Sequence, residues 1–166
     1  MLGRIVKGLV ILLVVLVVAI GAVFVGARFH DGPLGPIPGG SLQAGEWVSQ
    51  PPADWNFAKD VQEVEMQLAY ESASRTTWVL VNEGVAYIPC SLTQPPGKTW
   101  YKKADQNGQA IVRISGKRYP VTLVRVQDEE TRTKLGQVAV AKYPQAARVS
   151  SGGAWFFKLE PRAGAT

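Results

Sequence analysis

The feature that most constrains the fold of this chain is an uncharged apolar segment near its amino terminus. Residues 8–27 read GLVILLVVLVVAIGAVFVGA, and basic residues stand on both sides of them. About 20 apolar residues are enough to cross the ~30 Å hydrocarbon core of a bilayer as a helix. We therefore predict a membrane anchor over residues 1–29, with a single transmembrane helix at about residues 8–27.

A cleavable signal peptide is the alternative interpretation of this segment. It also has a basic start and an apolar core, and the Val-Gly-Ala sequence at 25–27 supplies small residues for cleavage. The length favours an anchor, because signal cores are usually only about 7–15 residues long. Arg4, Lys7 and the free amino terminus outnumber the basic groups that follow the helix. The positive-inside rule then predicts a single-pass protein of the inner (cytoplasmic) membrane with a periplasmic carboxy-terminal domain.

The formal net charge of +5 arises largely around this segment. Without Arg4, Lys7 and Arg28, 15 basic and 13 acidic residues remain. We therefore expect the membrane, and no nucleic acid, among the partners. One basic cluster lies between Lys98 and Arg125, and it indicates either an anion-binding face or solvated strand edges. An anion-binding face of this kind would bind anionic lipid or a polyanion with strong salt dependence.

The single histidine and the single cysteine exclude several classes of active site. His30 stands at the membrane boundary, so neither a Ser-His-Asp nor a Cys-His arrangement can form inside the domain. Cys90 lies in an apolar stretch, which predicts a buried side chain, and it has no partner for an intrachain disulfide. Because no recognised ligand spacing occurs, we predict no metal site, and we assign no catalytic residue.

Beyond the anchor, the chain predicts a Gly/Pro-rich tether with a turn at residues 30–59 and one domain at residues 60–166. Gly84 and Gly116 mark two hairpin turns. The predicted strands cover about 65–70, 76–81, 85–90, 110–114, 119–126 and 155–159, and helices are predicted before Asn107 and at about 128–143. Antiparallel pairing dominates this order. The pattern favours a mainly β (α+β) fold, a small antiparallel barrel with one or two flanking helices.

Two stretches of this domain carry a family resemblance. They are RTTWVLVNEGVAYIPCSL at 75–92 and GKTWYKK at 97–103, and they precede the hairpin AIVRISGKRYPVTLVRV and the helix start QDEETRTKL. This order resembles the FMN-binding split barrels of the pyridoxamine 5'-phosphate oxidase-like superfamily, including its deazaflavin-dependent nitroreductase-like branch. The resemblance covers about residues 60–143. It implies a split β-barrel that forms a homodimer and places its flavin at the dimer interface.

The resemblance also implies a site for the flavin phosphate. In that superfamily, the phosphate is bound by an arginine that opens a strand, a hydroxyl residue that ends its hairpin partner, and a lysine a few residues later. The matching positions are Arg75, Ser91 and Lys98. The full set of implied cofactor-binding residues is Arg75, Thr76, Thr77, Ser91, Lys98, Trp100 and Lys102. The implied cofactor is FMN or a deazaflavin.

Two functions from different classes follow from these patterns. The first is a membrane-anchored flavin- or deazaflavin-binding split-barrel protein, an oxidoreductase of the nitroreductase or quinone-reductase type that reduces a small or lipophilic electron acceptor. The second is a cofactor-free split-barrel envelope protein with a structural or interaction role. Export from the cytoplasm, where reduced nicotinamide cofactors are made, favours the second function, and so do Pro89 and the long loop at Pro95 and Pro96.

Overall fold

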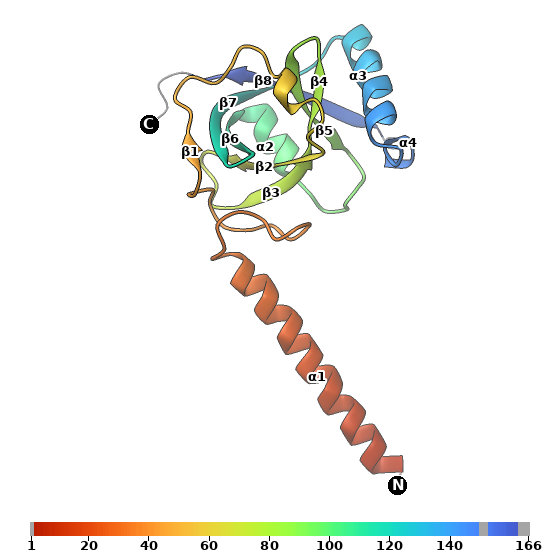
Figure 1. The fold of residues 1–166 in the computed structure, drawn as a ribbon. Coiled ribbons are helices and arrows are strands. Elements are labelled where there is room, and N and C mark those ends of the chain that lie inside the picture. Colours follow the sequence, from red (N-terminus) through yellow and green to blue (C-terminus); the bar gives the residue numbers. More distant parts are fainter. Residues whose placement is uncertain (1, 150–152, 163–166) are drawn as a thin grey trace.

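The computed structural model describes residues 2–149 and 153–162, and it places a long amino-terminal helix beside a small barrel (Figure 1). Helix α1, Leu2–Ala27, projects away from the barrel and leaves its apolar side chains exposed except for Ala27 at its end. It is long and apolar enough to cross a membrane. A signal sequence would meet the same criterion, so the helix fits both interpretations of the apolar segment.

The rest of the described chain is mainly strand. The strands are β1 (Glu46–Trp47), β2 (Glu63–Leu68), β3 (Ser74–Trp78), β4 (Leu80–Asn82), β5 (Val85–Ser91), β6 (Gln109–Ile114), β7 (Lys117–Arg125) and β8 (Ala154–Pro161). The helices are η1 (Asn56–Ala58), α2 (Trp100–Gln106), α3 (Glu129–Lys142) and α4 (Ala146–Val149). The predicted strands and helices of the domain are present with ends shifted by a few residues, except that the single strand predicted at 76–81 is two strands, β3 and β4, which part at Val79 and pair with different neighbours. The predicted α+β class is confirmed.

The strands form one sheet that closes on itself. Neighbouring strands follow the order β3-β2-β6-β7-β8-β5-β4, and all of these pairs are antiparallel. The two ends of this order, β3 and β4, are consecutive in the chain and only Val79 separates them. The covalent chain therefore joins the two ends of the sheet, and the result is a barrel.

Two hydrophobic clusters stabilise this barrel. The larger one fills its interior with fully buried side chains such as Met66, Ile88, Val112 and Phe157, and α2 adds Trp100 to it. The smaller cluster lies under α3 and contains Leu80, Tyr87, Leu135, Ala139, Tyr143, Ala146 and Phe156. Because α3 covers the outer face here, strands β4, β5 and β8 carry apolar side chains on both faces.

Local sequence signals set the hairpin turns and the start of α3. Glu83 and Gly84 have φ values of 53° and 76°, and Ser115 and Gly116 have 50° and 77°. Two consecutive positive values suit a two-residue hairpin loop, and a glycine in the second position relieves part of the strain. Asp128 caps α3, because its side chain accepts a hydrogen bond of 2.7 Å from the Thr131 amide.

Residues 28–48, which follow α1, lie against the outside of the barrel. The Asp31 carboxylate accepts hydrogen bonds from the amides of Gln43 (2.7 Å) and Ala44 (3.0 Å) and from Arg113 (2.9 Å) on β6. Arg113 also forms an ion pair with Glu65 on β2. The segment, which the sequence predicts as part of a tether, is therefore tied to the sheet at several points.

Candidate functional site

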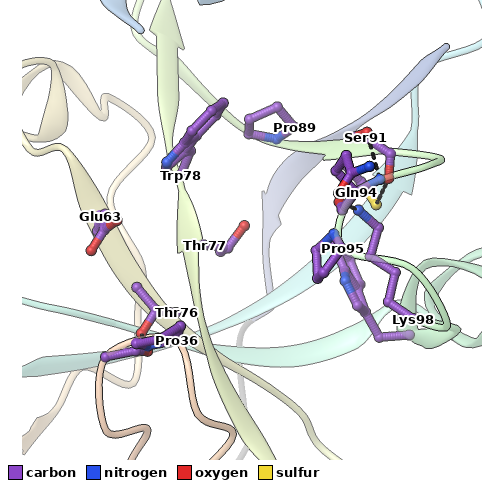
Figure 2. A pocket seen from close by; sticks show the side chains of 13 residues that line it. Pro36, Glu63, Thr76, Thr77, Trp78, Pro89, Ser91, Gln94, Pro95 and Lys98 are labelled. Atoms are coloured by element: carbon purple, nitrogen blue, oxygen red, sulfur yellow. Dashed lines mark hydrogen bonds between the residues drawn. The ribbon is translucent and has the colours of Figure 1, made fainter. Parts of the chain in front are cut away.

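The barrel is split between β3 and β5. Strand β4 pairs with β5 from Asn82↔Val85 to Leu80↔Tyr87, and beyond that point β3 pairs with β2 while β5 pairs with β8. If the β4–β5 register continued, Trp78 would stand opposite Pro89 and Thr76 opposite Ser91. The two strands diverge instead, and their facing edges border a cavity (Figure 2).

Pro89 explains part of this split. The Leu92 amide donates to the Gly153 carbonyl beside β8, so alternation along β5 turns the backbone of Ser91 and Pro89 toward the split. A proline in a paired strand would remove a ladder hydrogen bond, whereas at an open edge it leaves no unsatisfied donor. The proline that interrupts this strand in the sequence therefore stands where the fold requires no amide hydrogen.

Tyr143, just after α3, contacts the backbone at the point where β3 passes into β4 and the split begins. Its hydroxyl accepts a hydrogen bond from the Val79 amide (3.2 Å) and lies 2.8 Å from the Val79 carbonyl and 2.6 Å from the Gln62 carbonyl. The Lys142 ammonium also donates to Val79, over 2.9 Å. Side chains at the end of α3 thus satisfy the backbone where β3 passes into β4. Burial raises the pKa of Tyr143 to about 12, so the hydroxyl stays protonated.

The cavity in the split, which we name the split cavity, has a volume of about 430 Å³. Its apolar walls come from Trp78 and Pro89, which face each other at one end, and from Trp100 (Figure 2). Its polar lining comes from Glu63, Thr76, Thr77, Ser91, Gln94 and Lys98. A flat apolar ring with polar substituents matches this combination of walls.

Both tryptophans of the split cavity are held by other aromatic rings. The Trp78 ring stacks on that of Tyr143, with centroids 4.4 Å apart and planes at 9°. Trp100 is buried, and its ring centroid lies 5.7 Å from that of Phe157 in the barrel interior. The walls are therefore positioned by packing before any ligand enters.

A second cavity, which we name the basic cavity, adjoins the first. It measures about 780 Å³, and the two cavities share Pro36, Thr76, Pro95, Lys98 and Trp100. The basic side chains along its wall are Arg28, Arg75, Lys98 and Lys103. The one acidic residue among its lining residues is Glu71. An anion is the ligand that this lining favours.

Arg75 reaches the basic cavity from the inner face of the barrel. It stands opposite the fully buried Met66 in the β2–β3 register, and its guanidinium lies 5.5 Å from the centroid of the Trp100 ring. Its Nη2 forms an ion pair with Glu71 at 3.1 Å. Burial lowers the pKa of Arg75, and the Glu71 charge partly offsets this effect. The buried Nε has no hydrogen-bond partner in the described part of the chain, so this guanidinium retains donor capacity.

Ser91 and Lys98 also line the split cavity, Ser91 as the last residue of β5 and Lys98 on the loop that follows it. The Ser91 hydroxyl accepts hydrogen bonds from the amides of Thr93 (3.3 Å) and Gln94 (3.1 Å), which shapes this loop. The Lys98 ammonium donates to the Gln94 carbonyl. Burial lowers the pKa of Lys98, and the nearby Cys90 opposes that shift. Lys98 lines both cavities and is the charged residue among the five that they share.

The seven residues implied by the resemblance divide among these places. The split cavity is lined by Thr76, Thr77, Ser91, Lys98 and Trp100, and the basic cavity by Arg75 together with Thr76, Lys98 and Trp100. Lys102 lines neither cavity. It is exposed on α2, with its ammonium 6.0 Å from the centroid of the Tyr101 ring.

Three charged residues that line the basic cavity were not among the seven residues implied by the resemblance, namely Arg28, Glu71 and Lys103. Lys103 stands in the same basic run as Lys102, and helical spacing could have distinguished the two. Nothing local to Arg28 links it to a strand that begins more than 40 residues later. Cys90 lines the split cavity and is buried as predicted, and burial raises the pKa of its thiol to about 11. No group of acidic, histidine or cysteine side chains suited to a metal occurs among the described residues.

Comparisons with known proteins give the following. No family model matches the chain, and no curated protein matches it in sequence. Among solved structures, a chain described as a domain-swapped dimer is similar with a TM-score of 0.49 and 22% identity, over 61% of this chain and 81% of that one. An F420-H2-dependent reductase (FDR-A) is similar with a TM-score of 0.46 and 20% identity, over 59% of this chain and 91% of its own. Neither similarity identifies the function of this chain.

Proposed function

We propose that the split cavity binds the ring system of FMN or a deazaflavin, and that the protein is an oxidoreductase of the nitroreductase or quinone-reductase type acting on a small or lipophilic acceptor. The observation that carries this proposal is an aromatic-walled cavity of about 430 Å³ that passes, at Lys98, into a basic cavity. Cofactor pockets commonly measure roughly 300–1,000 Å³ and combine apolar walls with a few placed polar groups. A flavin and a deazaflavin both suit such a pocket, because each has a flat tricyclic ring joined to a ribityl phosphate.

The residues present fit such a cofactor. Trp78, Pro89 and Trp100 would cover the ring, while Thr76 and Thr77 on β3 would contact its edge or the ribityl chain. Lys98 and Arg75 would bind the phosphate, and the partnerless Nε of Arg75 offers a donor that the protein itself does not use. When bound, the cofactor supplies hydride transfer. The protein supplies position, exclusion of water and positive charge.

Titration of FMN and of a deazaflavin against the detergent-solubilised full chain tests this function. We expect saturable binding by cofactor fluorescence and at least about a 100-fold loss of affinity in an Arg75→Glu/Lys98→Glu variant, because charge-assisted hydrogen bonds contribute ~1.5–3 kcal/mol each. Lys102→Glu, outside both cavities, is the matched control and should change affinity less than about threefold. Absence of saturable binding of either cofactor to the folded chain would refute the proposal.

We further propose that α1 is an anchor in the inner membrane, with the barrel in the periplasm. The length of the helix and its exposed apolar surface support an anchor, and the basic residues before it support the orientation. The full chain should then resist extraction by alkaline carbonate, and the barrel should be cleaved by protease added to spheroplasts. An intact mass that lacks residues 1–27 would identify a signal peptide instead.

We also propose that the barrel forms a homodimer, as the sequence resemblance implies. Analytical ultracentrifugation of the detergent-solubilised chain measures its oligomeric state directly. The cofactor is added at concentrations above and below its dissociation constant. A chain that stays monomeric while it binds cofactor would exclude a site shared between two copies.

The cofactor-free structural or interaction role is retained as a second candidate, because the phosphate-site residues already have partners within the chain. Arg75 is paired with Glu71, Lys98 with the Gln94 carbonyl, and the Ser91 hydroxyl with its own loop. On this alternative, neutralising both cations as Arg75→Met and Lys98→Met, which adds no carboxylate beside Glu71, should leave unchanged the proteins that co-purify with the chain. Saturable binding of FMN or of a deazaflavin to the folded chain would contradict this alternative.

A further inference from the structure

Arg28 connects the apolar helix to the basic cavity. The backbone continues the helical pattern for one turn beyond α1, since the amides of Arg28, Phe29 and His30 donate to Val25, Gly26 and Ala27 over 3.0–3.1 Å. Arg28 therefore lies within one turn of the last apolar residues. In a membrane-spanning helix this is the level of the lipid headgroups.

The same arginine forms part of the wall of the basic cavity. Arg75, Lys98 and Lys103 are the other cations there, and Glu71 is the one acidic lining residue. The Glu71 carboxylate bonds to both Arg75 and Lys103, so it holds these two cations in place while neutralising only part of their charge. The cavity thus has a net positive lining that begins at the end of the apolar helix.

Hydrogen bonds fix this arrangement. The Gly40 amide donates to the His30 carbonyl (2.9 Å), and Gly39 exchanges two hydrogen bonds of 3.1 Å with Ser74 at the start of β3. Figure 1 shows the result, with β3 and the loop before it on the side of the barrel that faces α1. Two apolar side chains between α1 and Gly39 are exposed, Phe29 at 87% and Leu34 at 39%. Such side chains suit the boundary between headgroups and acyl chains.

We propose that the basic cavity binds the phosphate headgroup of an anionic phospholipid of the membrane that α1 spans. A phosphodiester offers charged oxygens to Arg28 and Lys103, two of the cations that line the cavity, and such charge-assisted hydrogen bonds are strong. The negative charge of an anionic leaflet adds a longer-range attraction for the same cations. The proposal rests on α1 as an anchor. A flavin phosphate would use Arg75 and Lys98 of the same cavity, so the lipid is tested here without flavin.

Soluble short-chain lipids test the ligand class without flavin. The full chain, in a nonionic detergent, is titrated with dihexanoyl phosphatidylglycerol, with dihexanoyl phosphatidylcholine and with inorganic phosphate, and binding is followed by thermophoresis. We expect saturable binding of phosphatidylglycerol, and affinities at least about tenfold weaker for the other two ligands. Equal affinity for the two lipids would overturn an anionic headgroup site. Inorganic phosphate that binds as tightly as phosphatidylglycerol would overturn the lipid as its source.

Neighbouring lysines on α2 supply the matched variants. Lys103 lines the basic cavity and Lys102 does not, although both are exposed lysines on the same short helix. Lys103→Glu should weaken phosphatidylglycerol binding at least about tenfold, and Lys102→Glu less than about twofold. Arg28→Gln and Lys103→Gln give the same comparison without a new negative charge, should Lys103→Glu fail to fold. An equal loss in Lys102 and Lys103 variants would indicate diffuse attraction and overturn the site.

Discussion

Strand β2 is flanked by two strands that each contribute a largely buried arginine, and these two arginines differ in how well their guanidinium groups are satisfied. Arg113 on β6 points outward, bonds to Glu65 and Asp31 and also donates to the Ala44 carbonyl (3.2 Å). Arg75 on β3 points inward, pairs with Glu71 alone and leaves its buried Nε without a partner among the described residues.

The shifts in the pKa values of the two arginines agree with this difference in their partners. The hydrogen bond with Glu65 raises the pKa of Arg113 and outweighs the effect of burial, whereas burial lowers the pKa of Arg75. A guanidinium with two carboxylates stabilises the fold, and one with spare donors beside a cavity can serve a ligand. Exposure does not distinguish these two arginines, whereas the number of their partners does, and for this reason we propose a ligand role for Arg75 and a structural role for Arg113.

The largest expected difference concerns stability. Arg113→Met should lower the free energy of unfolding by about 2–3 kcal/mol, because it leaves two carboxylates without their cation. This is less than the ~3–5 kcal/mol of fully buried pairs, since Asp31 and Glu65 are 34% and 30% exposed. Arg75→Met should cost less than about 1 kcal/mol, because Lys103 still neutralises Glu71. Urea unfolding followed by tryptophan fluorescence measures the free energy of unfolding of both variants. Equal losses in the two variants would contradict the difference proposed between Arg113 and Arg75.

A smaller, pH-dependent effect should appear at Asp31. Burial by itself would raise its pKa, but hydrogen bonds from Gln43, Arg113 and Ala44 outweigh burial and lower the pKa below the ordinary 3.8. The ionised carboxylate therefore stabilises the fold above about pH 3.8, and this stabilisation is lost as the pH falls through the lowered pKa. Asp31→Asn should flatten the dependence of the unfolding midpoint on pH below about pH 4. If the wild-type protein and Asp31→Asn showed the same slope below about pH 4, the interaction of Asp31 with Arg113 would not contribute to stability.

The smallest expected change in stability is at Glu71, where the comparison can be sharpened. Glu71→Gln removes the carboxylate that Arg75 and Lys103 share, and the unfolding free energy should change by less than about 1 kcal/mol. The positive potential of the basic cavity should rise, so that an anionic ligand such as dihexanoyl phosphatidylglycerol binds about two- to fivefold more tightly. Glu129→Gln, on the exposed surface of α3, is the control that should leave this affinity unchanged. Weaker binding in Glu71→Gln would show that the carboxylate orients the cations rather than competing with the ligand.

Much of the barrel was predictable because its signals are local. Alternating apolar residues predicted the strands, Gly84 and Gly116 predicted the hairpin turns through positive φ, and Asp128 predicted the start of α3 through its capping hydrogen bond. The burial of Cys90 followed from the apolar strand around it. Each of these features depends on a few neighbouring residues, which is why the sequence pattern alone reached them.

The candidate site was predictable only in part. Strand order brought Thr76, Thr77 and Ser91 to facing edges, yet the direction of Arg75 depends on its register with Met66, which no local pattern specifies. The widening of the split depends on the Tyr143 hydroxyl, which reaches Val79 from 64 residues away. Lys102 and Lys103 differ in sequence by one position, and only the rotation of α2 places Lys103 at the cavity.

The sequence by itself determined an apolar membrane-length helix, an antiparallel α+β barrel and the stretch of chain from which a polar site could be built. The tertiary structure decided that residues 28–48 are bonded to the barrel and that Arg28 joins Arg75 and Lys103 in one cavity. The physical reason is range. Helices, turns and caps follow from interactions over a few residues, whereas a cavity forms where side chains distant in the chain are brought together by packing and strand register.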